Sequence, residues 1–242
     1  MKTAIRLSIV LVACLGLAVG AAPASADLHP SGPVPTPKVA FTTTSTSPGS
    51  SFGVHARITF PASRTGRPYS VNSVGVAFPE GTRIDRTAVP VCRASDVDLY
   101  LRGTALCAES RLGTATAKVD FLGPGSEVLG GPYEEFLLGD GEIIIFEYNQ
   151  LGRPGPDGAT LAPLIFRAPL TDRGFTMFIP EGPSLALPDL LWALKSVDLT
   201  FADTGVFRLP AKATSEKWDF DVRFGYYVGA QQNVRIRVPV AV

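Results

Sequence analysis

Paired carboxylates are the residues of this chain that are best suited to chemistry. Five acids gather in one stretch, and the last of them directly follows an apolar run: Glu134, Glu135, Asp140, Glu142 and Glu147. Two carboxyl groups that face each other across a cleft can cleave a glycosidic bond. Acids on turns and at strand ends are usually only solvated, and the spacing of these five matches no acid motif. A carbohydrate-active site is therefore an alternative and not the leading prediction.

Few residues of this chain could support other catalytic chemistry or a metal site. The segment Asp140-Gly141-Glu142 lacks the regular ligand alternation of a calcium loop. A serine or cysteine nucleophile needs a base, usually histidine, and His55 has only Arg57 and Thr59 beside it on its polar face. His55 is better explained as a surface histidine on a strand. We therefore predict no catalytic residue, no cofactor and no metal site.

The first 26 residues predict an export signal. Basic residues precede an apolar run over 7–19, and small residues at 24–26 form a cleavage site. An alternative interpretation takes residues 11–14 as a lipid-attachment box, with Cys14 acylated at the mature N-terminus. The apolar run continues past Cys14, which favours removal of this cysteine with the signal. We therefore expect a secreted or extracellular protein, with association to the cell envelope as a variant of that prediction.

Two cysteines, Cys92 and Cys107, remain in the exported chain. In an oxidising compartment two such residues predict a disulfide bond. A metal site is the alternative, but two isolated cysteines without neighbouring histidines supply too few ligands.

Composition divides the rest of the chain into two parts. Residues 27–37 are rich in proline and form an extended tether, and residues 38–242 suit a single large β domain. Loss of the signal removes two of the 22 basic residues and none of the 22 acidic ones, so bulk charge does not attract nucleic acid. No later segment is long and apolar enough to be integral to a membrane. The expected partner is an unidentified extracellular protein or glycan.

Alternation of apolar and polar residues recurs between turn signals, as is typical of strands with one wet and one dry face. Six segments have this pattern: 54–60, 74–78, 115–121, 196–201, 218–224 and 234–240. Two further runs, 143–146 and 164–166, are apolar throughout and predict central strands that are covered on both faces or lie beneath a loop. Together they favour an all-β fold, a large two-sheet antiparallel β-sandwich of jelly-roll or Ig-like architecture.

One or two short helices interrupt this pattern. Ser95 is a suitable cap for a helix over 96–101, which Gly103 ends. Proline favours the start of a second helix over 188–194. The leucines of that segment are a candidate ligand-contacting or lipid-contacting patch. The simpler interpretation is a crossover helix that covers one end of the sandwich.

A cross-strand ladder of charges is expected near the C-terminus. Asp219 and Asp221 alternate with apolar residues, so both fall on the outer face of one strand. If the turn Gly-Ala-Gln-Gln-Asn joins two hairpin strands, these acids pair with Arg235 and Arg237. We expect a structural ladder and not a binding site.

The segments around the two cysteines carry a recognisable order of motifs. They read Phe-Pro-Glu-Gly at 78–81, Val-Pro-Val-Cys at 89–92 and Cys-Ala-Glu-Ser-Arg-Leu-Gly-Thr-Ala at 107–115. A proline-glycine turn, Pro-x-Cys and Cys-x-x-Ser-x-[Ile/Val/Leu]-Gly before a strand resemble a group of uncharacterised secreted proteins from actinobacteria, with Trp218 as a looser match. The resemblance implies an extracellular or envelope β-sandwich in which the cysteines hold the excursion before the strand near Gly113. It carries over no catalytic residue.

Three functions are compatible with these observations. The leading prediction is a non-enzymatic secreted or envelope module that binds a surface partner or glycan through its loops. The second is a carrier of an apolar ligand, which an internal cavity lined by apolar side chains would favour. The third is a carbohydrate-active enzyme with paired carboxylates.

Overall fold

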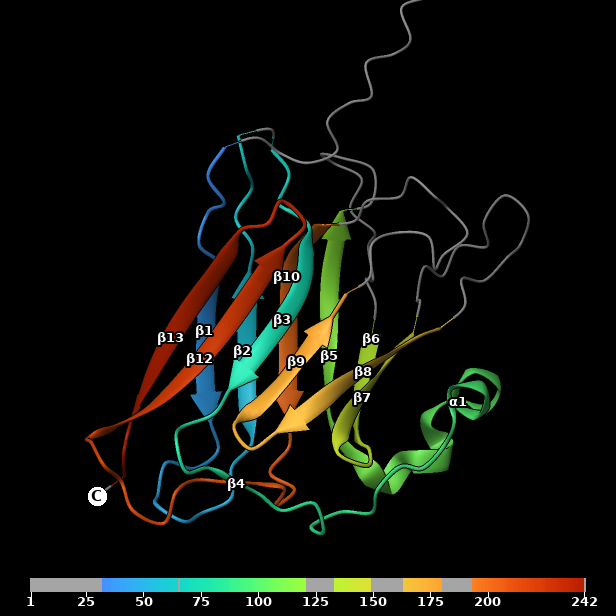
Figure 1. The fold of residues 1–242 in the computed structure, drawn as a ribbon, viewed down its shortest axis with the longest axis vertical. Helices are drawn as coiled ribbons and strands as arrows, with labels where there is room; N and C mark the ends of the chain where they lie inside the picture. The colour runs from blue at the N-terminus through green and yellow to red at the C-terminus, as the bar shows by residue number, and fades with distance from the viewer. Residues whose placement is uncertain (1–31, 65, 121–132, 149–162, 180–192, 242) are drawn as a thin grey trace, which may run out of the picture.

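The computed structural model describes residues 32–64, 66–120, 133–148, 163–179 and 193–241 (Figure 1). Within these ranges the chain forms short strands and two short helices. The helices are α1 (Asp96–Arg102) and the 3-10 helix η1 (Thr104–Ser110). The strands are β1 (Lys38–Thr43), β2 (Val54–Thr59), β3 (Val71–Ala77), β4 (Arg83–Ile84), β5 (Arg111–Asp120), β6 (Tyr133–Leu138), β7 (Glu142–Tyr148), β8 (Leu164–Thr171), β9 (Gly174–Phe178), β10 (Ala193–Phe201), β11 (Phe207–Arg208), β12 (Lys217–Tyr226) and β13 (Gln231–Pro239). The all-β prediction is confirmed.

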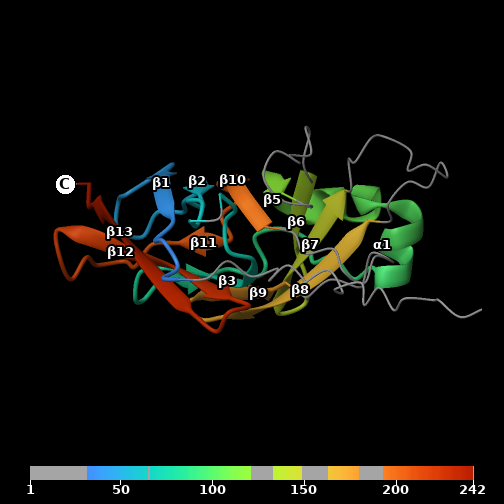
Figure 2. The same cartoon turned by 90° about the horizontal axis from the view of Figure 1, so that it is seen from above.

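Eleven strands join into one antiparallel sheet in the order β1-β2-β10-β5-β6-β7-β8-β9-β3-β12-β13. Seen from above, the sheet runs along one side from β1 to β6, turns at β7, and returns along the other side from β8 to β13 (Figure 2). We call this shape the flattened barrel. The predicted pair of separate sheets is not confirmed, because β7–β8 and β8–β9 pairing connects the two sides.

The edges β1 and β13 approach each other without a strand ladder, and other contacts cover the gap. The Trp218 indole N–H donates to the carbonyl of Thr46 at 2.8 Å, and the Gln232 amide donates to the carbonyl of Val34 at 2.6 Å. The rings of Phe41 and Phe220 lie 4.8 Å apart beneath. These side chains, with one backbone hydrogen bond from the Ala241 N–H to the Thr46 carbonyl at 3.2 Å, join the two sides of the gap.

Phenylalanines pack together in one of the two interior clusters of the flattened barrel. Phe78 and Phe207 have ring centroids 4.7 Å apart, and Phe52 packs edge-on against Phe220 at 5.8 Å. These side chains belong to a large buried cluster that also includes Phe201. Burying each aromatic side chain contributes about 2 kcal/mol or more from the area removed from water, so these contacts are a large part of the stability of the core.

The strand β7 is the sixth of the eleven and is covered on both faces, as its apolar run predicts. Ile143 and Ile145 face the interior, whereas Ile144 and Phe146 lie beneath the excursion between β4 and β5. The second apolar run is less covered, because residues 164–166 in β8 are only partly buried.

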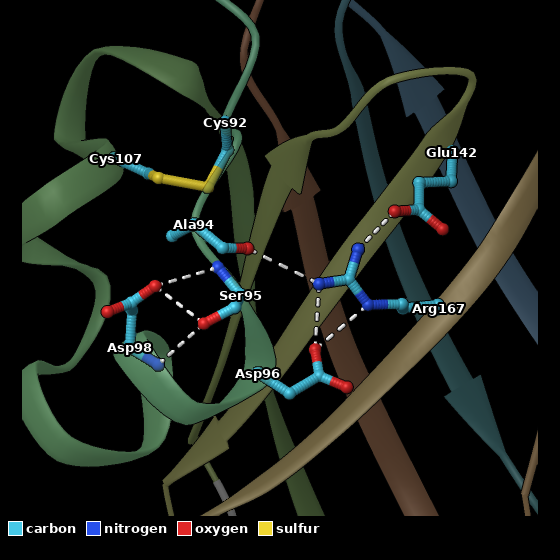
Figure 3. The surroundings of a disulfide bond; sticks show 8 residues. All are labelled: Cys92, Ala94, Ser95, Asp96, Asp98, Cys107, Glu142 and Arg167. Carbon is cyan, nitrogen blue, oxygen red and sulfur yellow. Dashed lines mark hydrogen bonds and ion pairs between the residues drawn. A yellow bond between two sulfur atoms is a disulfide. The ribbon is translucent and has the colours of Figure 1, made fainter.

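The excursion over β7 carries α1 and the predicted disulfide. Cys92 and Cys107 are bonded, with Cα atoms 5.3 Å apart, and they pack with Leu99 on the outer face of the sheet (Figure 3). Ser95 caps α1 as expected: its hydroxyl accepts from the Asp98 N–H, and the Asp98 carboxylate accepts from the Ser95 N–H. The sequence-based predictions of the bond and of this helix are both confirmed.

Two local predictions need correction. The second expected helix, over 188–194, lies outside the described residues up to 192, but Ala193 and Leu194 begin β10 and are buried. Strand pairing with β5 takes precedence there over the helical pattern. In the C-terminal hairpin the turn is earlier than expected, because β13 already begins at Gln231.

Candidate functional site

An apolar cavity of about 90 Å³ lies inside the flattened barrel, where its two interior hydrophobic clusters meet. Strands from both sides of the sheet supply its walls. Its described lining is Phe41, Val54, Ala56, Ile58, Phe60, Val74, Val76, Phe78, Glu134, Phe136, Ile145, Glu147, Phe166, Phe175, Met177, Ile179, Leu194, Val197, Leu199, Phe201 and Val222. All of these side chains are apolar except the two glutamates.

Glu134 and Glu147 are direct partners across the β6–β7 hairpin. The next inward pair on the same face is Phe136 with Ile145, and both of these also line the cavity. The two carboxyl groups therefore lie near the end where β7 stops and β6 begins, with apolar side chains deeper inside. Directly opposed residues place their Cβ atoms about 5 Å apart.

Glu147 is 8% exposed, and Glu134 is partly buried. Burial raises the pKa of Glu147 from 4.5 to about 7. Burial, and then the like charge of Glu147, raise the pKa of Glu134 to about 8. Two carboxyl groups this close titrate as a pair, so near neutral pH the pair keeps protons that exposed glutamates have released.

The other acids of this stretch face outward, where arginines pair with two of them. Glu135 is buried against Arg111, with an N–O distance of 3.0 Å. Glu142 pairs with Arg167, which also holds Asp96 of α1 at 2.7 Å (Figure 3). Asp140 is exposed on the turn between β6 and β7. Of the five predicted acids, the fold therefore brings only Glu134 and Glu147 into the cavity.

The charged residues on the outer face of β2 and β10 form structural pairs. His55 and Arg57 on β2 both contact Asp198 on the neighbouring β10, with His55 Nε2 2.9 Å from Oδ1 and Arg57 Nε 2.8 Å from Oδ2. The hydrogen bonds from Arg57 and His55 lower the pKa of Asp198. This confirms His55 as a surface strand residue with half of its side chain exposed.

The predicted ladder between β12 and β13 is also confirmed. Arg235 Nε lies 3.1 Å from Asp221 Oδ1, and Arg237 Nε lies 3.3 Å from Asp219 Oδ1. The strand register places each arginine directly opposite its acid. The Arg237–Asp219 pair is exposed and contributes about 1 kcal/mol or less, whereas Asp221 is buried and also has the Asn233 amide at 3.4 Å.

The lining determines what the cavity can bind. A sugar ring presents hydroxyl groups that need donors and acceptors, and the two glutamates are the only such side chains in the described lining. An apolar guest, by contrast, is matched by the walls, and the carboxyl pair can meet a polar group at one end. Within the described ranges, no cluster of three or more His, Cys, Asp or Glu side chains is arranged to hold a metal ion.

The pairing of Glu134 with Glu147 had a signal in the sequence that the five-acid grouping missed. Glu134 has the same parity as Phe136 and Leu138 along its strand, and Glu147 has that of Ile143 and Ile145. Because strand side chains alternate between faces, this parity places each glutamate on an apolar face. Acids at such positions are rare and indicate either a partner or a function.

Comparison of the chain with protein families, curated proteins and solved structures finds no match. In the described part of the chain no helix has the length and apolar character to cross a bilayer.

Proposed function

We propose that this protein is a secreted, non-enzymatic binding protein that holds the apolar part of a small ligand inside its flattened barrel. The observation that carries the proposal is the cavity itself, whose described walls are apolar apart from one pair of glutamates. Ligand sites of proteins are typically concave and apolar, with few polar groups to orient the guest. This favours the carrier over the loop-binding module that leads the sequence-based predictions.

The volume limits the size of the guest. A cavity of about 150 Å³ lined by apolar side chains can bind benzene. The cavity of about 90 Å³ therefore suits a chain of only a few carbon atoms, or the buried tail of a larger molecule. A tail that enters past Glu134 and Glu147 meets Phe136 and Ile145 next, which orders the guest with its polar end outermost.

Binding of 1-butanol tests the proposal, because its four carbons approach the volume available. We expect the alcohol to shift the methyl NMR signals of lining residues such as Val197 and Leu199. Intermolecular NOEs should appear between the protons of the alcohol and the same methyl groups. Ala56→Leu places three more carbon atoms at the cavity wall and should weaken binding at least about tenfold, while packing keeps the fold intact. The comparable change at exposed Ala40 on β1 should leave binding as it is. Equal binding by wild type and Ala56→Leu, or none by wild type, would contradict the proposal.

Export is the second part of the proposal and has its own measurement. The disulfide supports it, because such bonds persist in oxidising compartments. We expect the denatured protein from its own host to have a mass that begins at Asp27 and lacks two hydrogens. A lipidated mass that begins at Cys14 would instead place the protein on a membrane surface.

A further inference from the structure

We infer that Glu134 and Glu147 recognise a primary amine, so that the ligand is a small amine with an apolar tail that lies deeper in the cavity. This inference rests on the proposed function and names the chemical class of its ligand. Both residues line the cavity, and they face each other across the β6–β7 hairpin near the end where β7 stops and β6 begins. A ligand whose amine lies between them would have its apolar tail deeper in the cavity.

The decisive observation is that Glu147 has no hydrogen-bond or ion-pair partner among the residues that the structure describes. It is more than nine-tenths buried and lines the cavity. Glu135, equally buried on the other face of β6, has Arg111 at 3.0 Å. A buried carboxyl without a partner loses much of the hydration that would stabilise its ionised form. A ligand that supplies the missing positive charge would recover part of this cost.

The neighbouring elements offer no substitute cation. Glu134 has Ala115 of β5 beside it, and Glu147 has Leu164 of β8. The described residues that line the cavity from β2, β3, β9, β10 and β12 are all apolar. Glu135 follows Glu134 in sequence but lies on the other face of β6 with Arg111. The rings of Tyr133 and Tyr148 are tilted against each other at 5.8 Å, and the Tyr148 hydroxyl lies 2.7 Å from that of Thr104 on η1. In the described part of the site, each glutamate therefore has the other as its titratable neighbour.

An alkylammonium group fits this pair better than other polar groups do. It carries three donors and one positive charge, enough to reach both carboxyl groups. An alcohol supplies one donor and no charge, and a carboxylate would add a third negative group. A divalent cation takes six or more oxygen ligands, and the described lining offers two carboxyl groups.

Amine binding is coupled to proton release. Below pH 7 both carboxyl groups are largely protonated, since burial raises their pKa values to about 7 and about 8. When the ammonium group enters, at least one carboxyl loses its proton to solvent and becomes the counter-ion. The affinity should therefore rise with pH through this range, and fall again only near the pKa of the amine, about 10 for an alkylammonium such as lysine.

The experiment compares n-butylamine with 1-butanol on the intact protein, by NMR titration at pH 5.5 and pH 8. At pH 8 we expect the amine to bind at least about tenfold more tightly than the alcohol, and to lose at least that factor at pH 5.5. Glu147→Gln should remove the preference for the amine and its pH dependence, while 1-butanol still binds. Glu80→Gln, at an exposed position, is the matched control and should change neither.

The outcomes separate the inference from the proposed function. If the alcohol binds as tightly as the amine at pH 8, or if Glu147→Gln keeps the preference, the inference is wrong and the apolar carrier remains. If neither probe binds the wild-type protein, both are wrong. The pH comparison on wild type needs no variant, so the inference can be tested even if Glu147→Gln does not fold.

Discussion

Loss of the Cys92–Cys107 bond is expected to lower the free energy of unfolding by about 3 kcal/mol. The bond closes a loop with a sequence separation of 15, for which the entropy of the unfolded chain gives that magnitude. The double variant Cys92→Ser/Cys107→Ser should therefore unfold at a lower urea concentration than wild type. Circular dichroism in a urea titration measures the difference.

A reductant provides the control for this prediction. A thiol reductant should lower the midpoint of wild type to that of the double variant and leave the double variant unchanged. The excursion also keeps contacts that need no disulfide, namely the Cys92 N–H donated to the Leu138 carbonyl at 2.7 Å and the ion pair of Arg167 with Asp96. Equal midpoints with and without the bond would show that these contacts alone hold the excursion in place.

The second large effect is a loss of stability between pH 5 and pH 8. Burial raises the pKa of Glu147 from 4.5 to about 7, so in this range the folded protein holds a proton that the unfolded chain has released. Stability that depends on this proton is complete below about pH 4.5 and is lost as pH rises through about 7. The shift corresponds to about 3 kcal/mol for Glu147 alone. Glu134 changes stability in the same direction, over a range that extends to about pH 8.

The double variant Glu134→Gln/Glu147→Gln isolates this effect. An amide has nearly the size of the protonated carboxyl and does not titrate. The free energy of unfolding of the variant should therefore not fall between pH 5 and pH 8, and the variant should be more stable than wild type at pH 8. Urea unfolding at pH 5 and pH 8 gives the comparison, with Glu80→Gln as the exposed control. Hydrogen bonds lower the pKa values of Asp85, Asp98 and Asp198. These groups therefore change the stability only below about pH 4, outside the range between pH 5 and pH 8. A wild type that is as stable at pH 8 as at pH 5 would contradict the burial of the pair.

These two effects concern opposite faces of the same strand. The disulfide lies over Ile144 and Phe146 on the outer face of β7, and Glu147 lies beside Ile145 on the inner face. The excursion therefore covers the back of the strand that presents one half of the carboxyl pair. Amine binding should therefore also be measured on the double variant that lacks the disulfide, because a loosened β7 would displace Glu147.

Local patterns in the sequence predicted eight of the strands, α1 and the disulfide, but not β1, β4, β6, β9 or β11. Alternation defines a strand and its two faces within a few residues, and the Ser95–Asp98 capping box needs only one turn of chain. The ladder of Asp219 and Asp221 with Arg237 and Arg235 was also within reach, because a hairpin joins strands that are neighbours in sequence. Each of these features depends on residues close together in the chain.

Only the tertiary structure decided that one sheet curls into a flattened barrel and that two of five acids face its interior. The closure depends on pairs distant in sequence, such as β10 with β2 and β3 with β12, and alternation does not specify which strand lies beside which. The same holds for Arg167, which meets Asp96 across 71 positions on the outer face of the sheet. Parity indicates which face a glutamate occupies, but the surroundings of that face set its hydration, its charge and therefore its chemistry.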